Sequence, residues 1–80
     1  MDNRMGEVEW LHMFGDNLKC LLYEANMTQR ELARELDVAE STISRYISGE
    51  QLPSIKNVVN ISYVLDCDVS EMVDFGEPIW

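Results

Sequence analysis

Apolar residues recur along most of the chain at spacings of three and four, the period expected of helices that bury one face. No stretch alternates between apolar and polar residues in the way that a half-buried strand would. Five helical stretches can be distinguished, and short polar turns separate them. The pattern therefore predicts an all-α fold in which five helices form one compact domain.

The first helix is predicted over residues 13–26, because these residues share one apolar stripe. Eighty residues can bury a single core. The expected organisation is therefore one domain over residues 13–74, an N-terminal extension over residues 1–12 and a C-terminal tail over residues 75–80. The stripe occupies positions i, i+4, i+7, i+8 and i+11 of the first helix, and its members are Phe14, Leu18, Leu21, Leu22 and Ala25.

The second and third helices are predicted from their starting signals. Thr28 and Glu31 have the spacing of a capping box, in which each side chain accepts a hydrogen bond from the other residue's backbone N–H. A helix should therefore begin at Gln29. After an interruption at residues 37–39, a short third helix is predicted over residues 40–48. The side chains expected to face inward from these two helices are Leu32, Ala33, Leu36, Ile43 and Tyr46.

Further turn signals divide the second half of the chain. Gly49 can adopt the left-handed conformation that ends a helix, and Ser54 can cap a fourth helix over residues 55–65. Asp68 and Glu71 repeat the capping spacing and predict a fifth helix. The faces expected to be buried are Ile55, Val58, Ser62 and Leu65 in the fourth helix, and Val69, Met72 and Val73 in the fifth.

The formal net charge of −9 opposes binding to a polyanion such as a nucleic acid. The charge is unevenly distributed along the chain. Residues 28–60 carry four basic and five acidic side chains, whereas residues 61–80 carry no basic and five acidic ones. The middle of the chain is therefore nearly neutral, and the acidic groups after Ile61 are expected to point away from any bound DNA.

Several classes of function are disfavoured by the composition. No apolar run approaches the roughly 20 residues that span a bilayer, so no membrane partner is expected. Cys20 and Cys67 lack the spacing of a metal site or a disulfide framework, and both are expected to be buried or half-buried in a reducing cytoplasm. His12 is the only histidine and has no nucleophile or metal-ligand partner. We therefore expect no catalytic residue, no metal, no cofactor and no enzymatic activity.

The chain from about residue 14 to residue 73 resembles the helix-turn-helix family of phage Cro proteins, lambda-type repressors and bacterial xenobiotic-response-element regulators. The resemblance implies a lambda-repressor-like domain whose third helix enters the major groove of double-stranded DNA. It implies a sequence-specific transcriptional regulator of phage, prophage or bacterial origin, with repression favoured. The matching residues are Thr28-Gln29-Arg30-Glu31-Leu32-Ala33, Val38, Ser41-Thr42-Ile43-Ser44-Arg45-Tyr46, Gly49, Pro53-Ser54-Ile55 and Val69-Ser70-Glu71-Met72.

The resemblance also implies roles for individual side chains. In this family, the positions that match Glu40, Ser41 and Arg45 commonly touch bases, and Arg45 suits bidentate contact with guanine O6 and N7. Two alternatives stay open, namely a solvated arginine at position 45 and a Glu40 carboxylate that is placed by the helix dipole. The residues expected at the DNA backbone are Gln29, Thr42 and Ser44 from the family pattern, Ser54 and Lys56 from their place at a helix N-terminus, and Arg30 as a further phosphate contact.

Some positions depart from the family pattern. Asp37 stands where glycine is common, and Ala39 replaces a capping serine or threonine, which should cost about 1 kcal/mol of local helix stability. Ile47 stands where a charged residue is common and is expected to be exposed, as part of a subunit interface.

A homodimer is expected, because relatives of this fold usually bind two half-sites. The fifth helix and the tail are the predicted subunit contact. The alternative function is an acidic protein-interaction module, antirepressor-like or antitoxin-like, which would use the acidic C-terminal part to bind a protein partner. The residues predicted at the subunit contact are Val69, Met72, Phe75 and Trp80.

Overall fold

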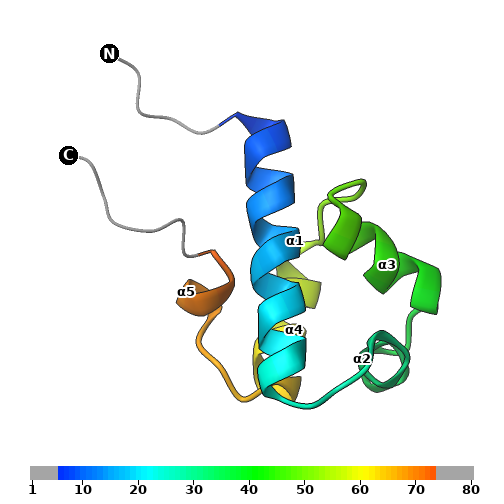
Figure 1. Cartoon of the computed structure of the whole chain (residues 1–80). Coiled ribbons are helices and arrows are strands. Elements are labelled where there is room, and N and C mark those ends of the chain that lie inside the picture. Colours follow the sequence, from blue (N-terminus) through cyan, green and yellow to red (C-terminus); the bar gives the residue numbers. More distant parts are fainter. Residues whose placement is uncertain (1–5, 74–80) are drawn as a thin grey trace.

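The computed structural model describes residues 6–73, and within these residues the chain forms five helices and no strand. The predicted all-α class is confirmed. Figure 1 shows α1 at the centre of the molecule, with α2 and α3 on one side of it and α5 on the other. Helix α1 contacts α3 and α5, while α4 contacts α2 and α5. The helices are α1 (Glu7–Glu24), α2 (Gln29–Leu36), α3 (Glu40–Ser48), α4 (Ile55–Val64) and α5 (Val69–Met72).

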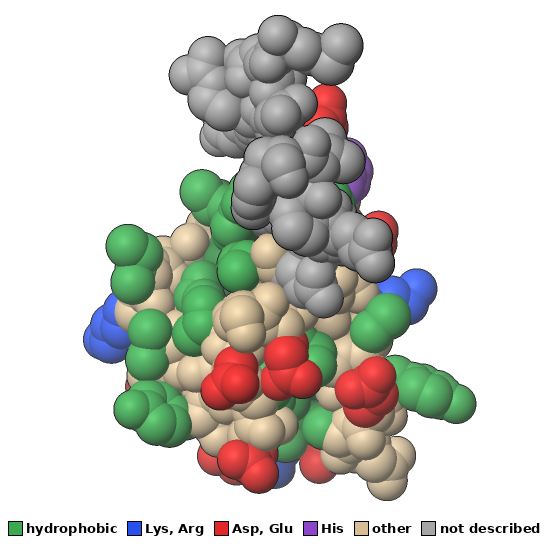
Figure 2. All heavy atoms as spheres, turned by 90° about the vertical axis from the view of Figure 1, so that its left-hand side faces the viewer, with side chains coloured by type: hydrophobic (Ala, Val, Ile, Leu, Met, Phe, Trp, Pro, Cys, Tyr) green, Lys and Arg blue, Asp and Glu red, His purple; other side chains and the backbone are tan. Residues whose placement is uncertain are grey.

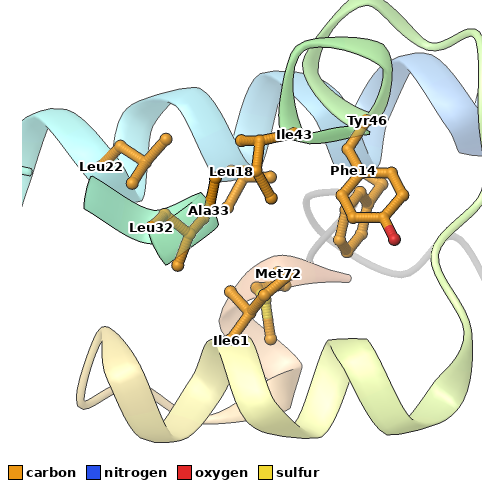
Figure 3. Packing of buried hydrophobic residues seen from close by; sticks show 9 residues of the cluster. All are labelled: Phe14, Leu18, Leu22, Leu32, Ala33, Ile43, Tyr46, Ile61 and Met72. Carbon is orange, nitrogen blue, oxygen red and sulfur yellow. The ribbon is translucent and has the colours of Figure 1, made fainter. Parts of the chain in front are cut away.

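One hydrophobic core draws side chains from all five helices (Figure 3). Because α2, α3, α4 and α5 have ten residues or fewer, each depends on burying its apolar residues against the other helices. Met72 of the short α5 is fully buried, and the backbone oxygen of the same residue accepts a hydrogen bond from Asn17 Nδ2 of α1 at 2.9 Å. The buried apolar residues are Phe14, Leu18, Leu22, Leu32, Ala33, Ile43, Tyr46, Ile61 and Met72.

Helix α1 begins at Glu7, and the prediction that it begins near residue 13 was wrong. Trp10 lies in the added part of the helix and stacks on Phe14, with ring centroids 5.6 Å apart. Phe14 in turn meets Tyr46 of α3 edge to face, at 6.5 Å between centroids. Residues 7–12 therefore extend the helix that supports the core instead of preceding it.

The buried face of α4 differs from the predicted one. Ile55 was expected to be buried and is 83% exposed, whereas Ile61 was not expected in the core and is completely buried. Val58 and Leu65 pack partly against the core, as predicted. The difference arises because α4 packs against α2 and α5 through the middle of the helix, and apolar spacing within ten residues does not fix that orientation.

Four other burial predictions were wrong. Ala25 is exposed, because α1 has already ended there, and Cys20 is exposed on α1. Ile47 packs partly against the core instead of lying exposed for a subunit contact. Val69, which was expected to be buried, is 38% exposed. The predicted burial of Met72 is confirmed, and because this side chain is buried within its own chain it cannot form the predicted subunit contact. Phe75 and Trp80, which were predicted at the same contact, lie outside the described residues.

Helices α1 and α3 approach each other closely at Gly15. A Cβ atom at this position would lie 2.7 Å from the backbone oxygen of Tyr46 and closer still to that of Ile47. Only glycine, which has no Cβ, lets the two backbones come this near. The C-terminal part of α3 therefore packs directly on α1.

Over the described residues, no helix combines the length and the apolar character needed to cross a bilayer.

Replacing Gly15 by alanine is expected to lower the free energy of unfolding by about 1–3 kcal/mol. The added Cβ meets backbone atoms, which cannot rotate away as a side chain could. Urea unfolding followed by circular dichroism measures the effect. Asp16→Ala, on the exposed neighbour in the same helix, is the control and should change stability by no more than about 0.5 kcal/mol. Equal stabilities of the two variants would contradict the close approach.

Candidate nucleic-acid interface

A three-residue turn sets the angle between α2 and α3. Asp37 ends α2 in the left-handed conformation, with φ 56° and ψ 45°, which glycine adopts more readily and which aspartate tolerates better than most residues. The backbone N–H of Val38 donates to the oxygen of Ala33 at 3.0 Å. The turn is therefore closed by its own backbone hydrogen bonds. Asp37 adopts the left-handed conformation at the position where the family commonly has glycine.

The two helices are also fixed by what they bury. Ala33 of α2 and Ile43 of α3 belong to one core cluster with Leu18 of α1 (Figure 3). A small residue at position 33 lets α2 and α3 pack closely. Tyr46 is 2% exposed and occupies the other end of α3. The buried face of α3 therefore anchors the helix to both α1 and α2.

The opposite face of α3 is polar and faces solvent. Figure 1 shows α3 on the side of α1 that lies away from α5, so neither α5 nor the ends of the described chain cover it. Thr42 is half-buried at the edge of this face. The structure thus places five of the predicted contact residues on one helix, and their roles toward DNA stay a prediction. The exposed members are Glu40, Ser41, Ser44 and Arg45.

The remaining predicted contacts lie in the first turns of α2 and α4. Gln29 is half-buried and Arg30 exposed at the start of α2. Ser54 and Lys56 are exposed at the start of α4, where Ser54 Oγ accepts a hydrogen bond from the backbone N–H of Asn57 at 3.1 Å. The predicted cap on α4 is confirmed. The first turn of a helix presents N–H groups that have no partner within the helix, which is a suitable place for a phosphate oxygen.

The capping box at α2 is confirmed in both directions. Thr28 N donates to Glu31 Oε1 at 3.0 Å, and Glu31 N donates to Thr28 Oγ1 at 3.1 Å. The hydrogen bond that the Thr28 backbone N–H donates to the Glu31 carboxylate, a hydrogen bond from the Thr28 side chain to the same carboxylate and the charge of Arg34 together lower the pKa of Glu31 below its ordinary value of 4.5. Glu31 is therefore held as a carboxylate that belongs to the helix end, and it is a positioning residue for α2.

Helix α3 ends in a defined turn that leads to α4. Gly49 has a φ of 80°, so the predicted left-handed stop is confirmed. Glu50 N donates to the oxygen of Arg45 at 2.9 Å, and Ser48 Oγ donates to Glu50 Oε2 at 2.6 Å. The backbone that carries Arg45 is therefore fixed by the segment that follows the helix.

Sequence reasoning missed one residue that positions the interface. Asn57 Nδ2 of α4 donates to the hydroxyl of Tyr46 at 2.9 Å. This bond ties the end of α3 to the start of α4, and hence relates the exposed face of α3 to Ser54 and Lys56. No local pattern in the sequence predicts this hydrogen bond, because an amide and a phenol eleven residues apart form no recognisable motif.

Acidic side chains gather on the part of the molecule that faces away from α3. Figure 2 shows several of them on the face that lies opposite α3 in Figure 1. Near α5, burial and the charges of Glu71, Asp68 and Asp66, in that order, raise the pKa of the Cys67 thiol. The negative charge of residues 66–71 is therefore concentrated around the connection from α4 to α5.

Comparison with known proteins identifies a family for most of the chain. The family HTH_3, described as helix-turn-helix, matches residues 19–72. The uncharacterised HTH-type transcriptional regulator YqaE of Bacillus subtilis is 30% identical over 61 residues, which are 76% of this chain and 53% of YqaE. The cryptic phage CTXphi transcriptional repressor RstR of Vibrio cholerae is 34% identical over 47 residues, which are 59% of this chain and 42% of RstR. The chain thus spans about half the length of these relatives.

Solved structures share the same arrangement of helices. A transcriptional regulator from Listeria innocua is 27% identical and superposes with a TM-score of 0.71, covering 84% of this chain and 63% of its own. The restriction-modification controller protein C.AhdI from Aeromonas hydrophila is 24% identical with a TM-score of 0.73, covering 78% of this chain and 94% of its own. The second likeness concerns the fold alone. Both agree with the five-helix fold described above.

Replacing Ala39 by serine is expected to raise the free energy of unfolding by about 1 kcal/mol. Ala39 has the extended conformation of a helix-capping residue, but its side chain makes no capping hydrogen bond to α3. The opposite change, Thr28→Ala, should lower stability by about 1 kcal/mol, since it removes the acceptor for Glu31 N. Urea unfolding of both variants beside the parent measures the two effects. An unchanged midpoint for Ala39→Ser would show that the missing cap does not limit α3.

Proposed function

Because this chain belongs to the helix-turn-helix family, we propose that it binds double-stranded DNA and regulates transcription as a repressor of phage, prophage or bacterial origin. The observation that carries the proposal is the exposed polar face of α3, which presents Arg45 to solvent while Ile43 and Tyr46 are buried beneath it. The match to a phage repressor supports the same reading.

In this proposal α3 lies in the major groove. Arg45 donates in a bidentate manner to O6 and N7 of a guanine, while Glu40 accepts from a cytosine amino group and Ser41 contacts either partner of a base pair. Ser44 and Thr42 lie against the groove wall in this proposal. Sequence preference then comes chiefly from Arg45, because a bidentate contact discriminates most strongly between bases.

Contacts with phosphates fix where α3 sits along the duplex. Gln29 and Arg30 contact phosphates from the start of α2. Ser54 and Lys56 contact phosphates from the start of α4. Such contacts set register and orientation without reading sequence. Since few cations face the DNA, we expect modest affinity with a shallow dependence on salt.

The net charge of −9 is compatible with this proposal because of where the charges lie. Charges are screened beyond about 8 Å at physiological salt. The acidic groups near Cys67 lie around α5, on the side of the molecule away from α3. They therefore weaken long-range attraction to DNA more than they oppose the contacts of the bound state.

The functional unit in this proposal is a homodimer that acts in the cytoplasm. Two copies of α3 would enter successive major grooves, with half-sites about 34–36 Å apart. No catalytic residue, metal or cofactor takes part.

The second candidate function is a protein-interaction module, which the net charge of −9 favours. In that case the acidic residues of the C-terminal part would bind a protein partner.

The interface is tested by recording backbone amide NMR shifts while short random-sequence duplexes are added, first at low and then at physiological salt. We expect shifts at Gln29, residues 40–45 and residues 54–56. They should weaken as salt rises, because phosphate contacts release bound counterions. No shift at either salt would overturn DNA binding and favour the protein-interaction module.

Arg45→Ala is expected to lower affinity for a selected operator by about 5- to 150-fold, which corresponds to about 1–3 kcal/mol. The loss should be much smaller on an unrelated duplex, since Arg45 reads bases. Fluorescence anisotropy with both duplexes measures the ratio. Arg34→Ala removes the same charge from the exposed surface of α2 and is the matched control. Equal losses in the two variants would show a general charge effect and contradict base contact.

A further inference from the structure

Asn57 lies in the first turn of α4 and makes hydrogen bonds in two directions. Its backbone N–H donates to Ser54 Oγ at 3.1 Å, and its side-chain Nδ2 donates to the hydroxyl of Tyr46 at 2.9 Å. Asn57 is half-buried, whereas Ser54 and Lys56 beside it are exposed. The residue therefore contacts the cap of α4 and the buried side of α3 at once, although it does not belong to the exposed face of α3.

The bond from Asn57 to Tyr46 joins two helices that do not pack closely on each other. Among the helices of the described chain, α3 packs against α1 and α2, and α4 packs against α2 and α5. Residues 49–54, which connect α3 to α4, form neither helix nor strand. Helix α2 is the common neighbour of α3 and α4. The hydrogen bond therefore closes a triangle of contacts between α2, α3 and α4.

Tyr46 offers Asn57 an acceptor whose position is fixed. The tyrosine side chain is 2% exposed, and its ring meets Phe14 of α1 edge to face. Figure 3 shows this side chain pointing from α3 in the direction of α4. Because a close-packed ring cannot shift without disturbing its neighbours, the hydroxyl keeps its place. The short side chain of Asn57 therefore holds the first turn of α4 at a set position relative to α3.

The other hydrogen bond of Asn57 leaves Ser54 able to contact a phosphate. A serine hydroxyl has lone pairs that accept and one proton that it can donate. Since Ser54 Oγ accepts from the backbone N–H of Asn57, its own proton can be donated to a phosphate oxygen. This cap uses the backbone of Asn57 and not its side chain. Loss of the side-chain bond to Tyr46 would therefore leave the cap of α4 in place.

We propose that Asn57 and Tyr46 are a pair of positioning residues that couples the phosphate contacts of α4 to the base contacts of α3. This inference rests on the proposed function. Phosphate contacts fix where a reading helix sits along the duplex. With α4 tied to α3, the contact of Lys56 with a phosphate also places Arg45 at its base pair. Discrimination between base pairs then depends on two side chains that touch neither base nor phosphate.

Tyr46→Phe removes the acceptor and keeps the ring that packs on Phe14. The test compares affinity for a selected operator with affinity for the same duplex changed at the base pair for which Arg45→Ala loses its preference. We expect Tyr46→Phe to lower this ratio by about 3- to 10-fold. A bond that served stability alone would leave the ratio unchanged while the protein is folded. Fluorescence anisotropy measures both affinities, and urea unfolding confirms that the variant is folded.

A double-mutant cycle of Arg45→Ala and Lys56→Ala measures the coupling itself. In the parent, we expect the combined loss of affinity to be smaller than the product of the single losses by about threefold or more. In the Tyr46→Phe background, the losses should multiply to within about twofold. Asn57→Ala should act as Tyr46→Phe does. Tyr63→Phe, which removes a hydroxyl from a side chain on α4 that is 79% exposed, is the matched control and should change neither result.

A measurement without DNA separates failure of this inference from failure of the proposed function. Residual dipolar couplings of the backbone N–H groups report how α3 and α4 are oriented in the full chain. In the parent, one alignment should fit both helices, whereas in Tyr46→Phe the couplings of residues 55–58 should deviate from that fit. Unchanged couplings, or an unchanged affinity ratio, would overturn the inference and leave DNA binding intact. A parent protein that binds no duplex would overturn the proposed function and this inference together.

Discussion

Tyr46 is the side chain on which the position of α3 depends. Its ring meets Phe14 of α1 edge to face at 6.5 Å, and its hydroxyl accepts the hydrogen bond of Asn57 from α4. The backbone oxygen of the same residue lies against Gly15, where a side chain would not fit. Tyr46 thus joins α3, the helix that carries Arg45, to α1 and to α4. Because this contact is buried, the opposite face of α3 is held outward in a fixed orientation.

Local signals in the sequence predicted the boundaries of α2, α3 and α4 well, but they missed the start of α1 and the contacts between helices. The capping box at Thr28 marked the start of α2 because cap chemistry is confined to four neighbouring residues. Helix α1 has Gly6 at its start without a side-chain cap, so its early beginning had no such signal. Burial of Ile61 in place of Ile55 depends on how α4 meets two other helices, and the bond from Asn57 to Tyr46 crosses between elements. The polar face of α3 could be predicted because its buried partners recur at helical spacing.

For DNA binding, the positions of the charged side chains matter more than the net charge. The nearly neutral middle of the chain supplies α2, α3 and the start of α4, whereas residues 61–80 carry acidic groups alone. Burial and the charges of Glu71, Asp68 and Asp66 raise the pKa of the Cys67 thiol near α5. A protein with a net charge of −9 can therefore still present a nearly neutral face around α3, from which the acidic groups near α5 are separated by distance and screening.

The left-handed aspartate at position 37 has a consequence for the unfolded chain. Glycine in this turn would adopt the same φ of 56° with less strain, but it would also leave the unfolded chain freer. A residue with a side chain reduces that freedom by about 0.4–1 kcal/mol, which offsets part of the native strain. The joint between α2 and α3 thus loses less conformational entropy on folding than a glycine joint would. Asp37 therefore contributes to the stability of this joint through the unfolded chain as well as through the folded turn.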